Sequence, residues 1–229
     1  MAGKRFLKKE AIRFGWESMK NNLVFFAFFV AIVWIVQVGI SLVANPVWGP
    51  RIVVLSFVSF IIGWMVSIFV TIATTKIGLR LSSAAGETAE ISDVWSGYPR
   101  FLDFLIGSVL YGLLVTVGLI LFIVPGIYWG IKYSMFGYCI IDKEMPPVAA
   151  MKESGKITMG AKWDLFLLGL LFFGIFILGL LACVVGLFAA VPTILVAHAY
   201  VYRKLAYGET IEQVPQVTPP PEAAQTPRA

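Results

Sequence analysis

The chain has 229 residues, of which 59% are hydrophobic and 14% are charged, with a net charge of +5. A soluble domain carries about a quarter charged residues, so this composition excludes an ordinary soluble domain and indicates a membrane protein. The basic residues flank apolar segments and form no basic domain, so they indicate orientation in a membrane and contact with anionic headgroups rather than nucleic-acid binding.

Residues 1–22 are predicted to form a cytoplasmic amphipathic segment, in which apolar side chains alternate with Lys and Arg. Six apolar segments follow, and a helix needs about 20 mostly apolar residues to cross the hydrocarbon core. The predicted spans are 23–44, 52–75, 101–124, 127–141, 163–185 and 190–205. Pro125 and Gly126 separate the third span from the fourth, and Gly186 and Pro192 the fifth from the sixth, with Pro192 suited to the first turn of a new helix.

Short amphipathic stretches precede the first, third and fifth spans, which raises the hypothesis of a threefold repeat of one interfacial helix and one hairpin. From residue 206 to 229 the chain is polar and rich in proline, which predicts a disordered cytoplasmic tail. The fold class expected is therefore an all-α integral membrane protein with six transmembrane helices in three hairpins.

Positive charge is distributed very unevenly over these segments. With six spans, 16 of the 18 Lys and Arg residues fall on one side, and the exceptions are Arg51 and Lys132. Cytoplasmic loops carry the excess of Lys and Arg, so both termini are predicted to be cytoplasmic. A bacterial cytoplasmic (inner) membrane is the expected location.

Polar residues inside the spans are the candidate functional groups. Lys132 is predicted to lie roughly 10 Å below the outer end of the fourth span, at 1.5 Å per residue, with Tyr128 and Tyr133 beside it. It could snorkel to lipid headgroups or serve a substrate or proton pathway. His198 and Gln37 lie at similar depth in other spans, and they could pair with neighbouring helices.

Small residues at four-residue spacing let helix backbones approach closely and are predicted to mark packing faces. These residues are Gly126, Gly130 and Ser134, then Ala182, Gly186 and Ala190, and finally Ser108 and Gly112.

Catalytic motifs and metal-ligand clusters are absent from the sequence. It contains one histidine and no GxSxG, P-loop or HExxH pattern. Neither an enzyme nor a cofactor or metal is expected. A structural, accessory or lipid-associated role is the first interpretation, and a transporter, channel or scramblase with a pathway near Lys132, Gln37 and His198 is the alternative. Expected partners are anionic lipid headgroups on the cytoplasmic face, and a protein partner or a homo-oligomer remains open.

Several short motifs resemble a known group of proteins. They are Val124-Pro125-Gly126-Ile127-Tyr128, the pair Lys132-Tyr133, and the loop from Ala150 through Lys152, Ser154 and Thr158 to Gly160. This pattern is similar to that of bacterial six-helix membrane proteins grouped with the membrane domain of glycerophosphoryl diester phosphodiesterases. The resemblance implies an integral membrane protein of largely uncharacterised role and carries over no catalytic residue. Lys132 stands where an arginine is usual, which keeps the charge but loses the planar fork that binds phosphate.

Overall fold

The computed structural model describes residues 6–43, 52–82, 97–181 and 185–208. All regular structure in these ranges is helical. The predicted tail beyond residue 208 and most of the amphipathic stretch before the third span lie outside them.

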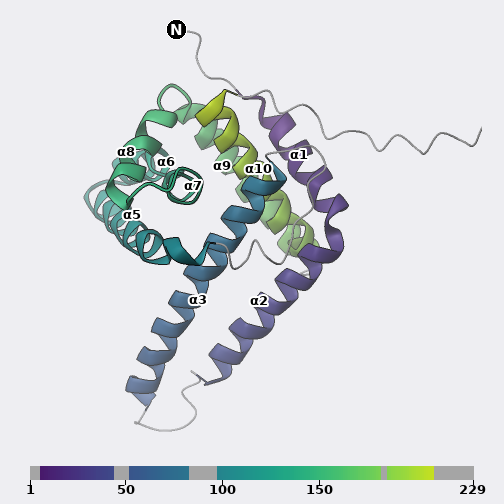
Figure 1. Ribbon diagram of the computed structural model, residues 1–229, viewed down its shortest axis with the longest axis vertical. Coiled ribbons are helices and arrows are strands. Elements are labelled where there is room, and N and C mark those ends of the chain that lie inside the picture. The colour runs from purple at the N-terminus through teal and green to yellow at the C-terminus, as the bar shows by residue number, and fades with distance from the viewer. Residues whose placement is uncertain (1–5, 44–51, 83–96, 182–184, 209–229) are drawn as a thin grey trace, which may run out of the picture.

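The N-terminal part forms an amphipathic helix and two long apolar helices (Figure 1). α1 (Lys8–Asn21) meets α2 (Leu23–Val43) at a bend of 87°. α3 (Ile52–Leu81) continues past the predicted end at residue 75 and includes Lys76 and Arg80. Beyond the apolar core of such a helix the backbone still satisfies its own hydrogen bonds, so the end of an apolar run need not end the helix.

The central part differs most from the prediction. The short 3₁₀ turn η2 (Tyr98–Arg100) leads into α5 (Phe101–Leu121). The predicted single helix over 127–141 is instead two helices, α6 (Ile123–Lys132) and α7 (Phe136–Asp142). Phe122 has an extended backbone and forms the turn, so Pro125 stands in the first turn of α6, where its missing N–H costs nothing.

α8 (Pro147–Ile157), α9 (Lys162–Leu181) and α10 (Val185–Tyr207) complete the fold. Pro192 lies inside α10 rather than in its first turn, contrary to the prediction. The proline ring is compatible with helical φ and removes one hydrogen-bond donor, and the buried packing around Pro192 holds the helix together at that point.

Within the part of the chain that the structure describes, four helices are long and apolar enough to cross a membrane: Phe57–Leu81, Tyr98–Leu121, Lys162–Leu181 and Gly186–Tyr207. A fifth is added if the bent pair of α1 and α2 is taken as one span. The length and composition of these helices are those of a membrane protein.

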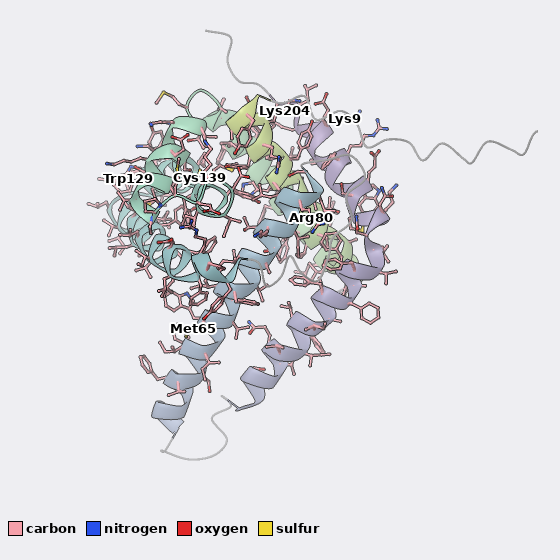
Figure 2. All side chains as sticks on the ribbon, viewed as in Figure 1. Lys9, Met65, Arg80, Trp129, Cys139 and Lys204 are labelled. Carbon is pink, nitrogen blue, oxygen red and sulfur yellow. The ribbon has the colours of Figure 1, made fainter. Side chains whose placement is uncertain are left out.

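The helices do not form a parallel bundle. In Figure 1, α2 and α3 lie along the page, whereas α5 and α7 are seen nearly end-on, so the two groups cross steeply. The amphipathic helices turn their apolar faces to the protein: α1 packs along α10, with Phe14 against Tyr200 and Gly15 against Ala197, and α8 packs on α7 with Met151 and Ser154 buried. Figure 2 shows the basic residues Lys9 and Lys204 at the end of the molecule opposite to the far ends of α2 and α3.

Candidate functional site: a lysine–tyrosine cluster beside a broken helix

α5 and the α6–α7 unit form one antiparallel pair along their whole length. Near the turn, a Cβ atom added to Gly118 would lie 2.8 Å from the Cα atom of Gly126, so the two backbones touch. Halfway along, the Tyr111 hydroxyl donates to the Gly130 carbonyl at 3.1 Å. At the open end, Arg100 contacts Glu144 at 2.5 Å. The pair therefore stays in register across the break between α6 and α7.

Two hydroxyl groups, of Ser154 in α8 and of Thr158 directly after it, lie against the backbone at that break. Ser154 Oγ accepts a hydrogen bond from the Met135 N–H and donates one to the Lys132 carbonyl, both at 3.1 Å. The Thr158 hydroxyl also lies 3.1 Å from the Lys132 carbonyl. A helix interruption leaves backbone groups without their usual partners, and here α8 supplies them.

Lys132 leaves the end of α6 next to α8. A Cβ atom added to Gly155 would lie 3.2 Å from Lys132 Cε, so the glycine leaves room for the lysine stem. Lys132 Nζ lies 4.9 Å from the centroid of the Tyr133 ring. This distance is within the range of a cation–π interaction.

Lys162 at the start of α9 forms a second contact of the same kind. Its Nζ lies 4.2 Å from the centroid of the Tyr128 ring and donates a hydrogen bond to the Tyr128 hydroxyl. Within the described ranges, neither Lys132 nor Lys162 forms a salt bridge, unlike Lys8, Lys143 and Lys204. We call Lys132, Lys162, Tyr128 and Tyr133 the lysine–tyrosine cluster.

Aromatic side chains extend the surface of this cluster. Tyr128 is 45% exposed and Trp163, which follows Lys162, is 74% exposed. Tyrosine and tryptophan are enriched where a membrane protein meets the headgroup layer, because one end of the side chain is apolar and the other prefers water. Two positively charged side chains therefore lie beside exposed aromatic residues of the kind found at the headgroup layer.

The other predicted polar residues lie elsewhere. Gln37 is on an exposed part of α2. The His198 ring packs against Tyr138 and Phe172, with a hydrogen bond of 3.2 Å between the Tyr138 hydroxyl and His198 Nδ1. The structure thus gathers Lys132, Tyr128 and Tyr133 but does not bring His198 or Gln37 to them.

The predicted small-residue positions also divide. Gly126 packs directly on α5, and Gly186 and Ala190 pack on Gly179 of α9. Gly130 makes an ordinary contact with Tyr111, and no heavy atom lies within 4 Å of a Cβ added to Gly112. Ser108 and Ser134 line a cavity, and Ala182 lies outside the described residues.

The role of Lys162 was missed by reasoning from sequence, which counted it only as a charge in a loop. Ser154 and Thr158 were noted for their spacing, but their backbone partners could not be read from it. The signal that could have found Lys162 is its place beside Trp163 at the start of an apolar segment, which is typical of a lysine at the headgroup layer.

Comparison with known proteins gives a family without an assigned function. The uncharacterized proteins Mb2590 of Mycobacterium bovis and Rv2560 of Mycobacterium tuberculosis are each 28% identical to the chain over 122 residues. This match covers 53% of the chain and 38% of each relative. No solved structure matches the chain.

Neither match carries a link to the glycerophosphoryl diester phosphodiesterase membrane domain that the motifs resemble. Residues 54–208 match the family described as "Protein of unknown function (DUF975)". The matched range includes every residue of the lysine–tyrosine cluster. Because this match covers more than half of the chain, the protein belongs to that uncharacterised family.

Proposed function

We propose that the protein is a multi-pass, lipid-associated protein of the bacterial cytoplasmic membrane that holds anionic lipid headgroups in its lysine–tyrosine cluster. The observation that carries the proposal is the pair of lysines, Lys132 and Lys162, on tyrosine rings and without a carboxylate partner in the described chain. A lysine near an anionic membrane surface contributes about 1 kcal/mol of attraction. The exposed Trp163 supports a position of the same surface at headgroup level, because tryptophan is enriched there.

The contacts of the α6–α7 unit favour the cytoplasmic leaflet for this site. Tyr128 of α6 meets Lys162 at the start of α9, and Asp142 of α7 accepts a hydrogen bond from Tyr202 near the end of α10. Since α9 and α10 are antiparallel neighbours, the start of one and the end of the other lie at the same end of the pair. The middle of α6 and the end of α7 therefore approach the end of the α9–α10 pair that the excess of Lys and Arg assigns to the cytoplasm.

The contact between Tyr128 and Lys162 favours a different path for the predicted fourth span. A fourth span perpendicular to the membrane would put Tyr128 near the outer surface, away from Lys162. We propose that α5, α6 and α7 form an oblique hairpin that enters and leaves from the cytoplasmic side, with α2, α3, α9 and α10 crossing the membrane. Both flanks of such a hairpin stay cytoplasmic, so the distribution of Lys and Arg and the cytoplasmic termini are retained.

We propose an accessory rather than a catalytic role for the protein. The transport alternative requires Lys132, Gln37 and His198 to share one pathway, and their separate positions favour it less. The kinship with the phosphodiesterase membrane domain, and a protein partner or homo-oligomer, stay predictions.

The test is lipid retention by the full chain. Protein in nanodiscs that contain phosphatidylglycerol and phosphatidylcholine is released into the gas phase, and bound lipids are counted by native mass spectrometry. The double variant Lys132→Gln/Lys162→Gln should lose about 2 kcal/mol of affinity for phosphatidylglycerol, about 30-fold, with phosphatidylcholine unchanged.

The matched control is Lys20→Gln/Lys152→Gln, which removes the same net charge from exposed lysines of α1 and α8. It should retain nearly all of the bound phosphatidylglycerol. Equal losses in the two double variants would show a general charge effect and would contradict a specific site.

A further inference from the structure

A cavity of about 510 Å³ lies apart from the lysine–tyrosine cluster, between α3 and the helices α5, α7, α9 and α10. Sites for small molecules usually measure about 300–1,000 Å³. A smaller cavity of about 160 Å³ adjoins it through the shared lining residues Ser134, Phe172 and His198. The volume is sufficient for a small ligand.

Hydroxyl groups line the α3 side of the larger cavity. They belong to Ser67, Thr71, Thr74 and Thr75, at spacings that place them on one side of the helix. Ser108 of α5 and Ser134, beside the break before α7, add hydroxyls from the other side. Large apolar side chains, among them Trp64, Phe104 and Phe136, complete the walls.

The hydrogen bonds of these hydroxyls determine what they offer a ligand. Thr71, Thr74 and Thr75 donate to carbonyl groups of their own helix at 2.8, 3.0 and 2.7 Å. A hydroxyl has one donor and two acceptor lone pairs, so each keeps accepting capacity once its proton is committed. The α3 wall is therefore suited to a ligand that donates hydrogen bonds.

The charge of the lining limits the ligand further. Among the described residues that line the cavity, none is Asp, Glu, Lys or Arg. A charged ligand would lose its hydration without gaining an opposite charge, which is costly in an apolar setting. A neutral donor is the class that fits.

We propose that this cavity binds a neutral polyol group attached to an apolar body, of the glyceride type. The ligand's hydroxyls donate to the oxygens of Thr71 and Thr75, and its apolar part lies against the aromatic wall. A free polyol such as glycerol shares the recognised chemistry and is the other source that the experiment separates.

The probe is a monoacylglycerol with a photoactivatable diazirine in its acyl chain, incorporated into nanodiscs with the full chain. After illumination, the labelled peptides are mapped by mass spectrometry. Peptides of α3 and α7 should be labelled in the wild type, and Thr71→Val/Thr75→Val should reduce this labelling at least about tenfold because two acceptors are lost. Ser108→Ala, which removes a hydroxyl group from the opposite wall of the cavity, should also reduce the labelling.

The matched control is Thr193→Val. Thr193 donates to its own helix at 2.7 Å in the same way, but it does not line the cavity. Its labelling should equal that of the wild type, and the thermal unfolding of all variants shows that they are folded.

Two further arms complete the test. Suppression by excess free glycerol would assign the site to a soluble polyol, whereas no suppression would assign it to the lipid. Equal labelling by the probe with both hydroxyls methylated, or undiminished labelling of Thr71→Val/Thr75→Val, would overturn the proposal.

Discussion

The side-chain oxygen of Ser154 forms hydrogen bonds from α8 to both sides of the break between α6 and α7. That oxygen accepts the Met135 N–H and donates to the Lys132 carbonyl, and both Ser154 and Met135 are fully buried. Thr158 reaches only one of these groups: its hydroxyl lies 3.1 Å from the Lys132 carbonyl and 2.9 Å from the Ser154 carbonyl, and the two carbonyls share its single proton. The two residues therefore differ in what their removal leaves unsatisfied.

We expect Ser154→Ala to destabilise the protein by about 1–3 kcal/mol, because the buried Met135 N–H loses its acceptor. Thr158→Val should cost about 1 kcal/mol or less, since Ser154 still donates to the Lys132 carbonyl. Thermal unfolding in nanodiscs measures both. The reverse order of stabilities would show that Ser154 does not hold the break.

Lys132 shows what the sequence predicts at this scale and what it does not. Its exceptional place among the basic residues and its tyrosine neighbours can be read from the sequence, and the structure places Tyr133 beside it. The contact with Gly155 and the nearby Lys162–Tyr128 pair cannot be read, because they depend on how α8 folds back on α7. Contacts between segments 20 or more residues apart leave no periodic signal along the chain.

At the scale of helices, the close contact between the backbones of α5 and α6 depends on Gly118. The four-residue spacing of small residues did not select this glycine. Gly118 faces the backbone of Gly126, whereas Gly112, which the rule selected, has open space around it. Four-residue spacing identifies a face of one helix, but it does not say which face the partner covers.

We expect Gly118→Ala to destabilise the hairpin by about 1–3 kcal/mol, because the new methyl group would overlap backbone atoms of α6. Gly112→Ala, on the same helix, should be neutral or stabilising by up to about 1 kcal/mol through helix propensity. Thermal unfolding separates them, and equal effects would contradict the packing described for α5 and α6.

An ion pair joins α7 and α8 beyond the break. Lys143 donates to Glu153 at 2.9 Å and Lys156 lies 3.5 Å from the same carboxylate, and the hydrogen bond from Lys143 lowers the pKa of Glu153 below its ordinary 4.5. Because the folded pKa is the lower one, the pair stabilises the fold above about pH 4.5 and loses this contribution as the pH falls through the lowered value.

Glu153→Gln should therefore reduce stability by about 0.2–1 kcal/mol at pH 7, the usual range for a partly exposed pair. The difference from the wild type should shrink towards zero as the pH falls below the lowered pKa. Unfolding temperatures of both proteins at several pH values provide the measurement. A difference that does not change with pH would contradict an electrostatic role for Glu153.

For the whole molecule, composition was sufficient to predict a helical protein with several long apolar helices, and the described residues confirm this. The sequence pattern did not predict the break within the fourth span. Its 15 residues fit either one short helix or two shorter ones, and the structure has the latter. Hydropathy measures how apolar a segment is, not its angle to its neighbours. The steep crossing of α5 over α3 is a property of tertiary packing, so it could not be predicted.

The most direct test of the proposed arrangement is the side from which position 132 is accessible. Cys139 and Cys183 are replaced by alanine, and single Lys132→Cys and Lys152→Cys variants are treated with a membrane-impermeant maleimide. We predict that both positions react in inside-out vesicles and neither in right-side-out vesicles. Reaction of Lys132→Cys only from the outside would put Lys132 at the outer headgroups, as the six-span prediction has it, and would contradict the cytoplasmic site.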